Sequence, residues 1–373
     1  AARVQKIASS YAEDNDHFVL IGIGGSSLGA ETLLKGAAPA FGKKKFYLID
    51  HLDSNRVQQV LEEIDPKRTC LCLVSKSGKT FESLATFLIF RKFLKEKLGI
   101  GYRRHLVVIT DPAEGPLRKM IEEEKLESFA VPPGVGGRFS VLTPAGLFPA
   151  AFFGVNLQEL LSGGRRMDEF CQREDWMESP AFVSAVIHYL FAVKKKKHMR
   201  VVLTYAEALH TYGDWFCQLW AESLGKKFSL NGKPIYAGST PIPSEGVRDQ
   251  HSQLQLYLEG PFDKVIDFVT VEKGNSIKIP EAPASLGESG RQLQKKELRD
   301  LAKAEEQATI DALTSEKRPN VSYRLPELNA HSLGQLLLLS EIETVVAGQL
   351  WGINPFDQPA VEIIKKNVRA RIG

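Results

Sequence analysis

The feature that most constrains the fold is the order in which short apolar runs and amphipathic stretches follow one another. In the first half of the chain, apolar runs with the length of a buried strand alternate with stretches of helical spacing, such as 28–36 and 81–98. The predicted strands are His17–Ile23, Lys45–Ile49, Thr69–Val74, His105–Thr110 and, at the edge of the sheet, Ser128–Val131. Strands that are apolar on both faces and separated by helices are typical of a parallel sheet covered by helices. The pattern therefore predicts an α/β domain.

A second α/β unit begins near residue 181 and repeats this order. Its predicted strands are Arg200–Tyr205, Pro234–Gly238 and Lys264–Val271. Its predicted helices are 181–193, 212–226 and 246–258. Segment 273–290 is expected to be an exposed excursion, and the chain beyond 293 is expected to be mostly helical, with its last helices at 333–350 and 360–372.

These elements predict two α/β domains, each with a mainly parallel sheet covered by helices. The first domain is expected to span 1–160 and the second 181–328. A polar, helical bridge is expected over 161–180, and a C-terminal helical arm over 329–373.

Charge and cysteine content limit the partners and the compartment. The chain has 48 Lys and Arg against 45 Asp and Glu, a net charge of +3, which is too balanced for a nucleic-acid or anionic-membrane partner. Its four cysteines show neither a CxxC pair nor metal-ligand spacing, which indicates a reduced, cytoplasmic compartment. The longest apolar stretch, Val141–Val155, is broken by prolines and too short to span a membrane, and Ala1–Asp16 lacks the apolar core of a signal peptide. We therefore expect a cytoplasmic protein with no metal site.

The loop after the first predicted strand, Gly22–Gly29, opens a helix and allows three functional interpretations besides a structural tight turn. Its first two glycines fit a dinucleotide fingerprint, but Ser27 stands where the third glycine should be. Gly25–Gly29 also fits the G-x-S-x-G elbow of hydrolases, with Ser27 as the nucleophile. The third interpretation is an anion cradle, in which backbone N–H groups at the helix start and a serine hydroxyl bind phosphate.

The loop after the third predicted strand, Ser75–Thr80, favours phosphate. Its Gly-Lys-Thr is similar to a P-loop, but Leu73 stands where Walker A needs glycine, and the loop is too short to wrap a polyphosphate. Three hydroxyls and an ammonium at a helix N-terminus suit one terminal phosphate, while capping of the helix by these hydroxyls is the alternative. Because the carboxyl ends of parallel strands meet at one edge, both loops are expected to converge on a phosphomonoester there.

Further side chains could take part in a reaction. Arg138 follows two glycines and offers a fixed positive charge suited to an oxyanion or enediolate. Glu222 lies on the apolar stripe of helix 212–226, where partial desolvation suits a general base, and Gln218 faces the same way. Lys365 lies within the apolar stripe of the last helix and either snorkels or reaches a site, whereas a capping or surface role is favoured for His251.

Five motifs occur in a fixed order along the chain. They are Gly22-Ile-Gly-Gly-Ser26, Ser75-Lys-Ser-Gly-x-Thr-x-Glu82, Gly136-Gly-Arg-Phe-Ser-Val-Leu-Thr-Pro-Ala-Gly146, Glu222-Ser-x-Gly-Lys226 and Asn354-Pro-Phe-Asp-Gln-Pro-x-Val-Glu-x-x-Lys365. Together, over about 18–367, the set resembles that of the glucose-6-phosphate isomerase family. The length is closer to the shorter bacterial members, and the chain is expected to begin after their helical N-terminal segment. Ala360 and Lys79 depart from the glycine and threonine that are usual in the family.

The resemblance implies two sugar-isomerase-type (SIS) domains with a C-terminal helical arm. It implies interconversion of glucose 6-phosphate and fructose 6-phosphate without metal or cofactor. The substrate-binding residues that it implies are Ser75, Lys76, Ser77 and Thr80 around the phosphate, with Gly25, Ser26, Gln218 and Gln358 nearby.

The resemblance also implies a role for each reactive side chain. Glu222 would move a proton between C2 and C1, and Arg138 would stabilise the cis-enediolate. Lys365 and His251 would open the sugar ring, with the histidine donated by the neighbouring subunit of a homodimer. Two alternatives remain: a non-catalytic sugar-phosphate sensor on the same domains, and a serine α/β hydrolase that uses Ser27.

Overall fold

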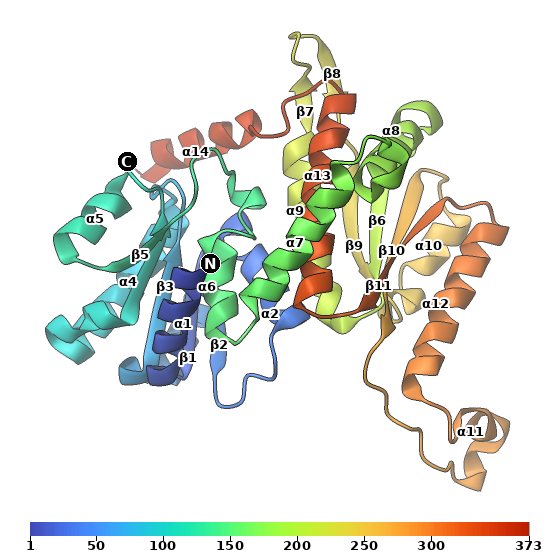
Figure 1. Cartoon of the computed structure of the whole chain (residues 1–373), viewed down its shortest axis with the longest axis horizontal. Coiled ribbons are helices and arrows are strands. Elements are labelled where there is room, and N and C mark those ends of the chain that lie inside the picture. The colour runs from blue at the N-terminus through green and yellow to red at the C-terminus, as the bar shows by residue number, and fades with distance from the viewer. Residues whose placement is uncertain (373) are drawn as a thin grey trace.

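Two parallel sheets lie side by side in the computed structural model, which describes residues 1–372 (Figure 1). The first sheet has the order β2-β1-β3-β4-β5, and all of its strands are parallel. Its strands are β1 (His17–Ile21), β2 (Lys45–Ile49), β3 (Thr69–Val74), β4 (Leu106–Thr110) and β5 (Glu127–Ala130). These are the strands predicted for the first half of the chain, in nearly the predicted bounds.

Helices cover both faces of the first sheet because its strands are apolar on both sides. Phe18 and Leu20 of β1 pack on one face, and Val19 and Ile21 on the other. One face is covered by α3 (Ser54–Glu63), α4 (Phe81–Leu98) and α5 (Pro116–Glu124). The opposite face is covered by α1 (Ala2–Asp14), α2 (Leu28–Ala37) and α6 (Pro144–Phe152). The sequence analysis did not predict α1.

The second sheet is also parallel, in the order β11-β10-β6-β9, and it corrects two expectations. Its strands are β6 (Met199–Thr204), β9 (Thr240–Glu245), β10 (Lys264–Lys273) and β11 (Asn320–Glu327). Neither β9 nor β11 was predicted. β9 contains Pro241 and Pro243, which a central strand would exclude; it pairs only with β6, so its prolines lie on the open edge. β11 lies in a segment that was expected to be helical.

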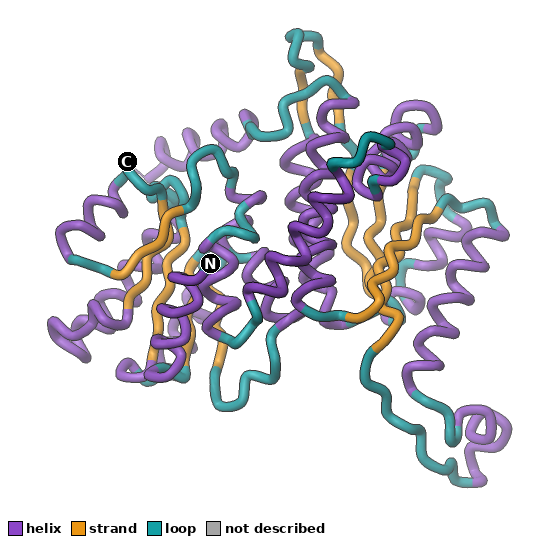
Figure 2. The backbone as a smooth tube through the Cα atoms, in the orientation of Figure 1, coloured by secondary structure: helices purple, strands orange, loops and turns teal. Residues whose placement is uncertain are grey.

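Other parts of the second unit also depart from the sequence pattern. The predicted strand 234–238 is β8 (Pro234–Ala237), which pairs with β7 (Lys226–Phe228) as a separate antiparallel hairpin that projects from the molecule (Figure 2). The predicted helix 246–258 is only the 3-10 turn Arg248–His251 followed by α10 (Leu254–Glu259). Beyond the excursion come α11 (Gly287–Leu293) and α12 (Leu298–Ser315).

A layer of helices joins the two sheets (Figure 1). It contains α7 (Leu157–Cys171), α8 (Pro180–Lys195), α9 (His210–Leu224) and α13 (Ala330–Leu350). Helices α7 and α13 touch through their backbones, since a Cβ on Gly163 would lie 1.9 Å from the carbonyl oxygen of His331 and one on Gly334 would lie 2.0 Å from that of Leu160. Helix α13 is therefore part of this central layer, and only α14 (Pro359–Ile372) reaches out as an arm. The domain boundaries stay a prediction.

A buried ionic cluster ties the second sheet to this layer. Arg200 on β6 donates through Nε to Asp267 Oδ2 at 2.6 Å and through Nη2 to the Tyr323 hydroxyl at 2.9 Å, and its Nη1 lies 2.8 Å from Glu343 Oε1. His188 Nε2 lies 3.2 Å from Asp267 Oδ1. Burial alone would raise the pKa of Asp267, but attraction from Arg200 and His188 outweighs it and holds that pKa below its usual range.

Replacing Asp267 with Asn should leave Arg200 short of a counter-charge inside the protein. We expect the free energy of unfolding at pH 7 to fall by about 3–5 kcal/mol. Because the folded pKa lies below the unfolded value of 3.8, the carboxylate stabilises the fold above that pH, and this contribution is lost as the pH falls through the folded value. Urea titrations between pH 7 and pH 3 should therefore show the two chains converging in stability toward acid.

Asp311→Asn on the exposed side of α12 is the matched control and should change the free energy of unfolding by less than about 0.5 kcal/mol. A difference between wild type and the Asp267 variant that grows toward acid would contradict the assigned pairing.

Candidate active site

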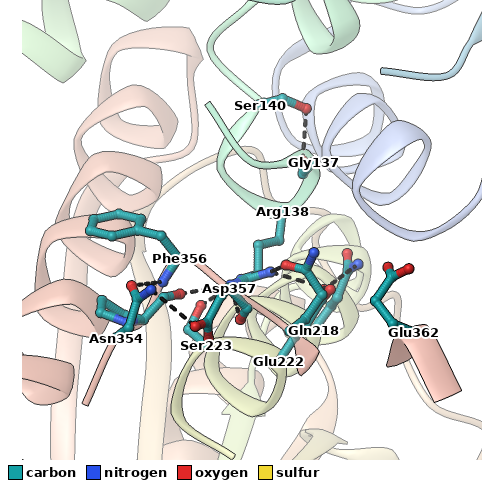
Figure 3. A network of polar contacts seen from close by, with 12 residues as sticks. Gly137, Arg138, Ser140, Gln218, Glu222, Ser223, Asn354, Phe356, Asp357 and Glu362 are labelled. Carbon is teal, nitrogen blue, oxygen red and sulfur yellow. Dashed lines mark hydrogen bonds and ion pairs between the residues drawn. The ribbon is translucent and has the colours of Figure 1, made fainter. Parts of the chain in front are cut away.

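The loops that follow β1 and β5 meet through their backbones at the carboxyl edge of the first sheet. A Cβ on Gly25, in the 3-10 turn Gly24–Ser26, would lie 2.2 Å from the carbonyl carbon of Gly137, in the turn Gly137–Phe139. Ser140 Oγ donates to the carbonyl oxygen of Gly137 at 2.7 Å (Figure 3) and to that of Gly25 at 3.2 Å. Ser27 is fully buried and its hydroxyl donates to the carbonyl of Gly24, so it is not the exposed nucleophile that a hydrolase needs.

The loop between β3 and α4 presents its hydroxyls to a pocket. Gly78 has a φ of +62°, a conformation that favours glycine and turns the chain sharply between strand and helix. Ser75 Oγ donates to Thr80 Oγ1 at 3.3 Å, and Ser77 Oγ accepts from the backbone N–H of Lys79 at 3.2 Å. Thr80 is the N-cap residue of α4, but its side chain makes no capping hydrogen bond. The side chains of Ser77 and Thr80 therefore line the pocket, whereas Ser75 is buried and is not among its lining residues.

The pocket in front of this loop has a volume of about 510 Å³. It lies where β1, β3 and β4 end, and α14 crosses above it (Figure 1). Its lining side chains are polar, mostly hydroxyl-bearing or charged: Ser26, Lys76, Ser77, Lys79, Thr80, Asp111, Glu114, Gln358, Glu362 and Lys365. Three of these side chains are lysines and three are carboxylates, so the lysines and hydroxyls can bind an anionic group while the carboxylates and Gln358 can accept from hydroxyl groups of a ligand.

Arg138 is the centre of the adjoining polar network (Figure 3). Its side chain is 2% exposed. Its Nε donates to Ser223 Oγ at 2.7 Å, and its Nη1 donates to Gln358 Oε1 at 2.9 Å. Its Nη2 donates to the backbone carbonyls of Pro355 at 2.6 Å and Asp357 at 3.2 Å. Burial lowers the pKa of Arg138, while Glu222 and Asp357 oppose that shift.

Glu222 lies beside this guanidinium in the last turn of α9. Its Oε1 lies 3.2 Å from Arg138 Nη1, and its Oε2 accepts from Gln218 Nε2 at 3.1 Å. The side chain is 26% exposed, which confirms the partial burial expected from its position on the stripe. Gln218 Oε1 is buried and has no hydrogen-bond partner among residues 1–372. Gln358 connects the two regions, because it bonds Arg138 and also lines the 510 Å³ pocket.

Lys365 lines the same pocket, although the apolar stripe on its helix is not buried. Its side chain is 53% exposed, and Nζ lies 2.6 Å from Glu362 Oε1. The apolar stripe of α14 does not pack into a core, since no described residue of this helix is buried. Lys365 therefore reaches the pocket from an exposed helix that crosses the sheet edge.

His251 does not join the other residues within one chain. It is exposed in the turn after β9, where the strands of the second sheet end. Helix α9 begins at that edge, with His210 beside Glu245, and Glu222 comes twelve residues later. At 1.5 Å per residue, Glu222 and His210 are separated by about 18 Å along the helix. His251 and Glu222 thus lie toward opposite ends of α9.

Sequence reasoning missed Ser223, Lys226 and the carbonyls of Pro355 and Asp357. Lys226 Nζ donates to the backbone carbonyls of Glu222 and Ser223 at the end of α9. Arg138 itself could have indicated that such acceptors lie nearby. A buried guanidinium has five N–H donors, and each needs an acceptor. Ser223 lies directly beside Glu222 in one of the recognised motifs.

The fold places the chain in a class of proteins with known structures. The fold is similar to that of tagatose-6-phosphate ketose/aldose isomerase from Escherichia coli, with a TM-score of 0.55 over 95% of this chain and 88% of that chain. At 13% identity this likeness shows the fold alone. The chain thus has two mainly parallel sheets covered by helices and a helical C-terminal segment, as predicted, and it shares this fold with that isomerase.

The family follows from closer matches. The family model described as phosphoglucose isomerase matches residues 8–372, and the chain belongs to that family. The chain is 41% identical to the glucose-6-phosphate isomerase of Carboxydothermus hydrogenoformans, over 100% of this chain and 82% of that protein. It is also similar to the crystal structure of a hypothetical protein from Thermus thermophilus, with a TM-score of 0.93, 39% identity, and coverage of 100% of this chain and 87% of that one.

Two other kinds of site have no counterpart in the described part of the chain. Within residues 1–372, no helix combines the length and the apolar character needed to cross a bilayer. Over the same residues, no three His, Cys, Asp or Glu side chains are grouped so that they could hold a metal ion.

Replacing Gly25 with Ala should push the two loops of the site apart, since the new methyl group would overlap the backbone of Gly137. We expect the free energy of unfolding to fall by about 1–3 kcal/mol, as for other overpacked sites. Urea unfolding measures this change. Gly137→Ala is the matched control from the same contact, because its Cβ would have no atom within 4 Å. Equal stability losses in the two variants would contradict the close approach of the loops.

Proposed function

We propose that this chain is an aldose–ketose isomerase that interconverts glucose 6-phosphate and fructose 6-phosphate. The observation that carries the proposal is the Glu222–Arg138 pair at 3.2 Å, connected through Gln358 to a pocket lined by hydroxyls, lysines and carboxylates. A carboxylate beside a fixed cation suits the removal of a proton next to a carbonyl group, and the pocket suits a phosphate. The relatives' names point to the same reaction.

The phosphate end of the substrate would bind at the β3–α4 loop. Ser75, Ser77 and Thr80 supply hydroxyls and Lys76 supplies positive charge, for a group that carries about −1.5 to −2 charges at neutral pH. The substrate-binding residues on the sugar side would be Gly25, Ser26, Gln218 and Gln358. Because the phosphate is remote from the reacting carbons, its binding energy can orient the open-chain sugar over Glu222.

The chemical step would be a proton transfer through a cis-enediolate. Glu222 takes the proton from C2 of the open-chain aldose, and the C–H electron pair forms the C1–C2 double bond while O1 becomes negative. The Arg138 guanidinium stabilises this oxyanion. Glu222 then returns the proton to C1, the hydroxyl on C2 becomes the carbonyl group, and O1 takes up the proton that O2 loses.

Ring opening would need two further groups. Lys365 lines the pocket in this chain. The partner subunit's His251 would supply the second group in a homodimer, and the separation of His251 from Glu222 along α9 supports a source outside the chain. We also propose a cytoplasmic location, in keeping with four cysteines that form no disulfide.

Replacing Glu222 with Gln should abolish solvent hydrogen exchange during isomerisation. With fructose 6-phosphate in deuterated buffer, wild type should give glucose 6-phosphate labelled at C2, and the variant should lose at least about 10²-fold in rate because the base is gone. Mass spectrometry of the product measures both. Glu259→Gln, an exposed glutamate on α10, is the control.

Two outcomes would count against this proposal. Undiminished labelling by the Glu222 variant would remove it as the base. Binding of the sugar phosphate by wild type without any turnover would favour the sensor instead.

Mixing two inactive variants tests the shared site. When Glu222→Gln and His251→Ala chains are dissociated and reassociated together, half of the dimers are mixed, and each has one intact site. We expect about a quarter of wild-type activity. Mixing Glu222→Gln with Arg138→Ala is the control and should recover nothing, since these residues act from the same chain. No recovery in the first mixture would exclude a histidine donated across subunits.

A further inference from the structure

Lys226 is a buried cation that the proposed reaction does not use. It follows Gly225, the C-cap residue of α9, and opens β7. Its side chain is only 5% exposed and folds back onto the end of α9. Burial of an ammonium group costs free energy unless hydrogen bonds or opposite charges compensate for the loss of water.

The ammonium closes the last turn of α9. Nζ donates to the backbone carbonyls of Glu222 at 2.8 Å and Ser223 at 2.7 Å. Carbonyls in a last helical turn lack partners within the helix, and a positive charge is favoured at this end of the helix dipole. Nζ also lies 3.8 Å from Asp357 Oδ1.

Each of the three residues that Lys226 contacts also contacts Arg138. The carboxylate of Glu222 lies 3.2 Å from Nη1, Ser223 Oγ accepts from Nε at 2.7 Å, and the Asp357 carbonyl accepts from Nη2 at 3.2 Å. We propose that Lys226 is a positioning residue, which fixes the base Glu222 and the guanidinium of Arg138 relative to each other. This inference rests on the proposed function.

Lys226 acts from behind the site and does not line the phosphate pocket. It lines a separate cavity of about 640 Å³, together with Phe228, Leu230, Pro359 and Ile363 among others. Two of its three N–H donors are committed to backbone carbonyls. It therefore reaches the reaction only through the groups that it holds.

The charges around Lys226 are balanced in pairs. Arg138 and Lys226 face Glu222 and Asp357. Burial and the nearby Arg138 lower the pKa of Lys226, and Asp357 and Glu222 oppose the shift. Removing this ammonium would leave Glu222 with one cation fewer nearby, which favours its protonated form.

The test replaces Lys226 with Met, which keeps the unbranched stem, and with Ala and Arg. For Met we expect kcat for fructose 6-phosphate to fall by about 10²-fold, as for other small misplacements of catalytic groups, with KM changed less than about threefold. The acid limb of the kcat/KM profile should move to higher pH. The Arg variant, which keeps the charge, should recover part of kcat. Lys227→Met, on the exposed neighbour, is the matched control.

The adjacent cavity allows a second readout. Ethylammonium can enter the 640 Å³ cavity and occupy the volume left in Lys226→Ala, so it should raise kcat of that variant in a saturable way and leave Lys227→Ala unchanged. Backbone hydrogen exchange at residues 221–225 should be faster in the Met variant than in wild type, whether or not the chain is an isomerase.

The outcomes separate the two claims. A wild type without isomerase activity would remove the proposed function, and unchanged hydrogen exchange in the Met variant would remove the positioning role. With an active wild type, a Lys226→Met variant that keeps wild-type kcat, or that loses KM alone, overturns the inference. So does the absence of rescue by ethylammonium together with an unmoved pH profile.

Discussion

The site depends on one constraint, the need of a buried guanidinium for five acceptors. Arg138 donates hydrogen bonds to Ser223 Oγ, Gln358 Oε1 and the carbonyls of Pro355 and Asp357, and its Nη1 also forms an ion pair with Glu222 Oε1 at 3.2 Å. These acceptors come from the end of α9 and from the segment between α13 and α14, far from Arg138 in the sequence. Because an unpaired buried donor is costly, satisfying Arg138 fixes three distant segments in one arrangement. Glu222 and Arg138 are thus positioned by the same contacts that join these segments.

Much of the fold could be predicted because the first sheet is buried on both faces. Runs such as Thr69–Val74 have a single reading as strands when helical spacing and glycine loops separate them. In the second sheet, the edge strands were the ones that the sequence did not predict. β9 pairs on one side only, which lets Pro241 and Pro243 occupy it. β11 has a single buried residue, Leu325, among exposed and half-buried ones, and no continuous apolar run. An edge strand pairs on one side only, so it tolerates more residue types than a central strand. Its sequence is therefore harder to recognise as a strand.

In the site, side chains could be predicted from the sequence and backbone groups could not. The hydroxyls of the β3–α4 loop and the half-buried Glu222 could be predicted, since side-chain chemistry and helical spacing reveal them. The carbonyls of Pro355 and Asp357 could not, because any residue supplies a carbonyl and only the path of the chain decides where it points. For Lys365 the sequence left open whether the side chain snorkels or reaches a site. Its helix carries an apolar stripe, yet α14 lies exposed across the sheet edge and brings the lysine to the pocket by that route.

Helix α9 runs from the carboxyl edge of the second sheet to the carboxyl edge of the first. Its first turn lies at the carboxyl edge of the second sheet, beside the loop with His251, and its last turn brings Glu222 to the carboxyl edge of the first. Parallel sheets place their functional loops at their carboxyl edges, and a straight helix between the two keeps those edges apart. A single chain therefore has Glu222 and Arg138 at one end of α9 and His251 near the other. In the proposed homodimer, a two-fold axis that sets the first edge of one copy against the second edge of the other would bring a His251 to each Glu222, because an isologous contact repeats the same pairing twice.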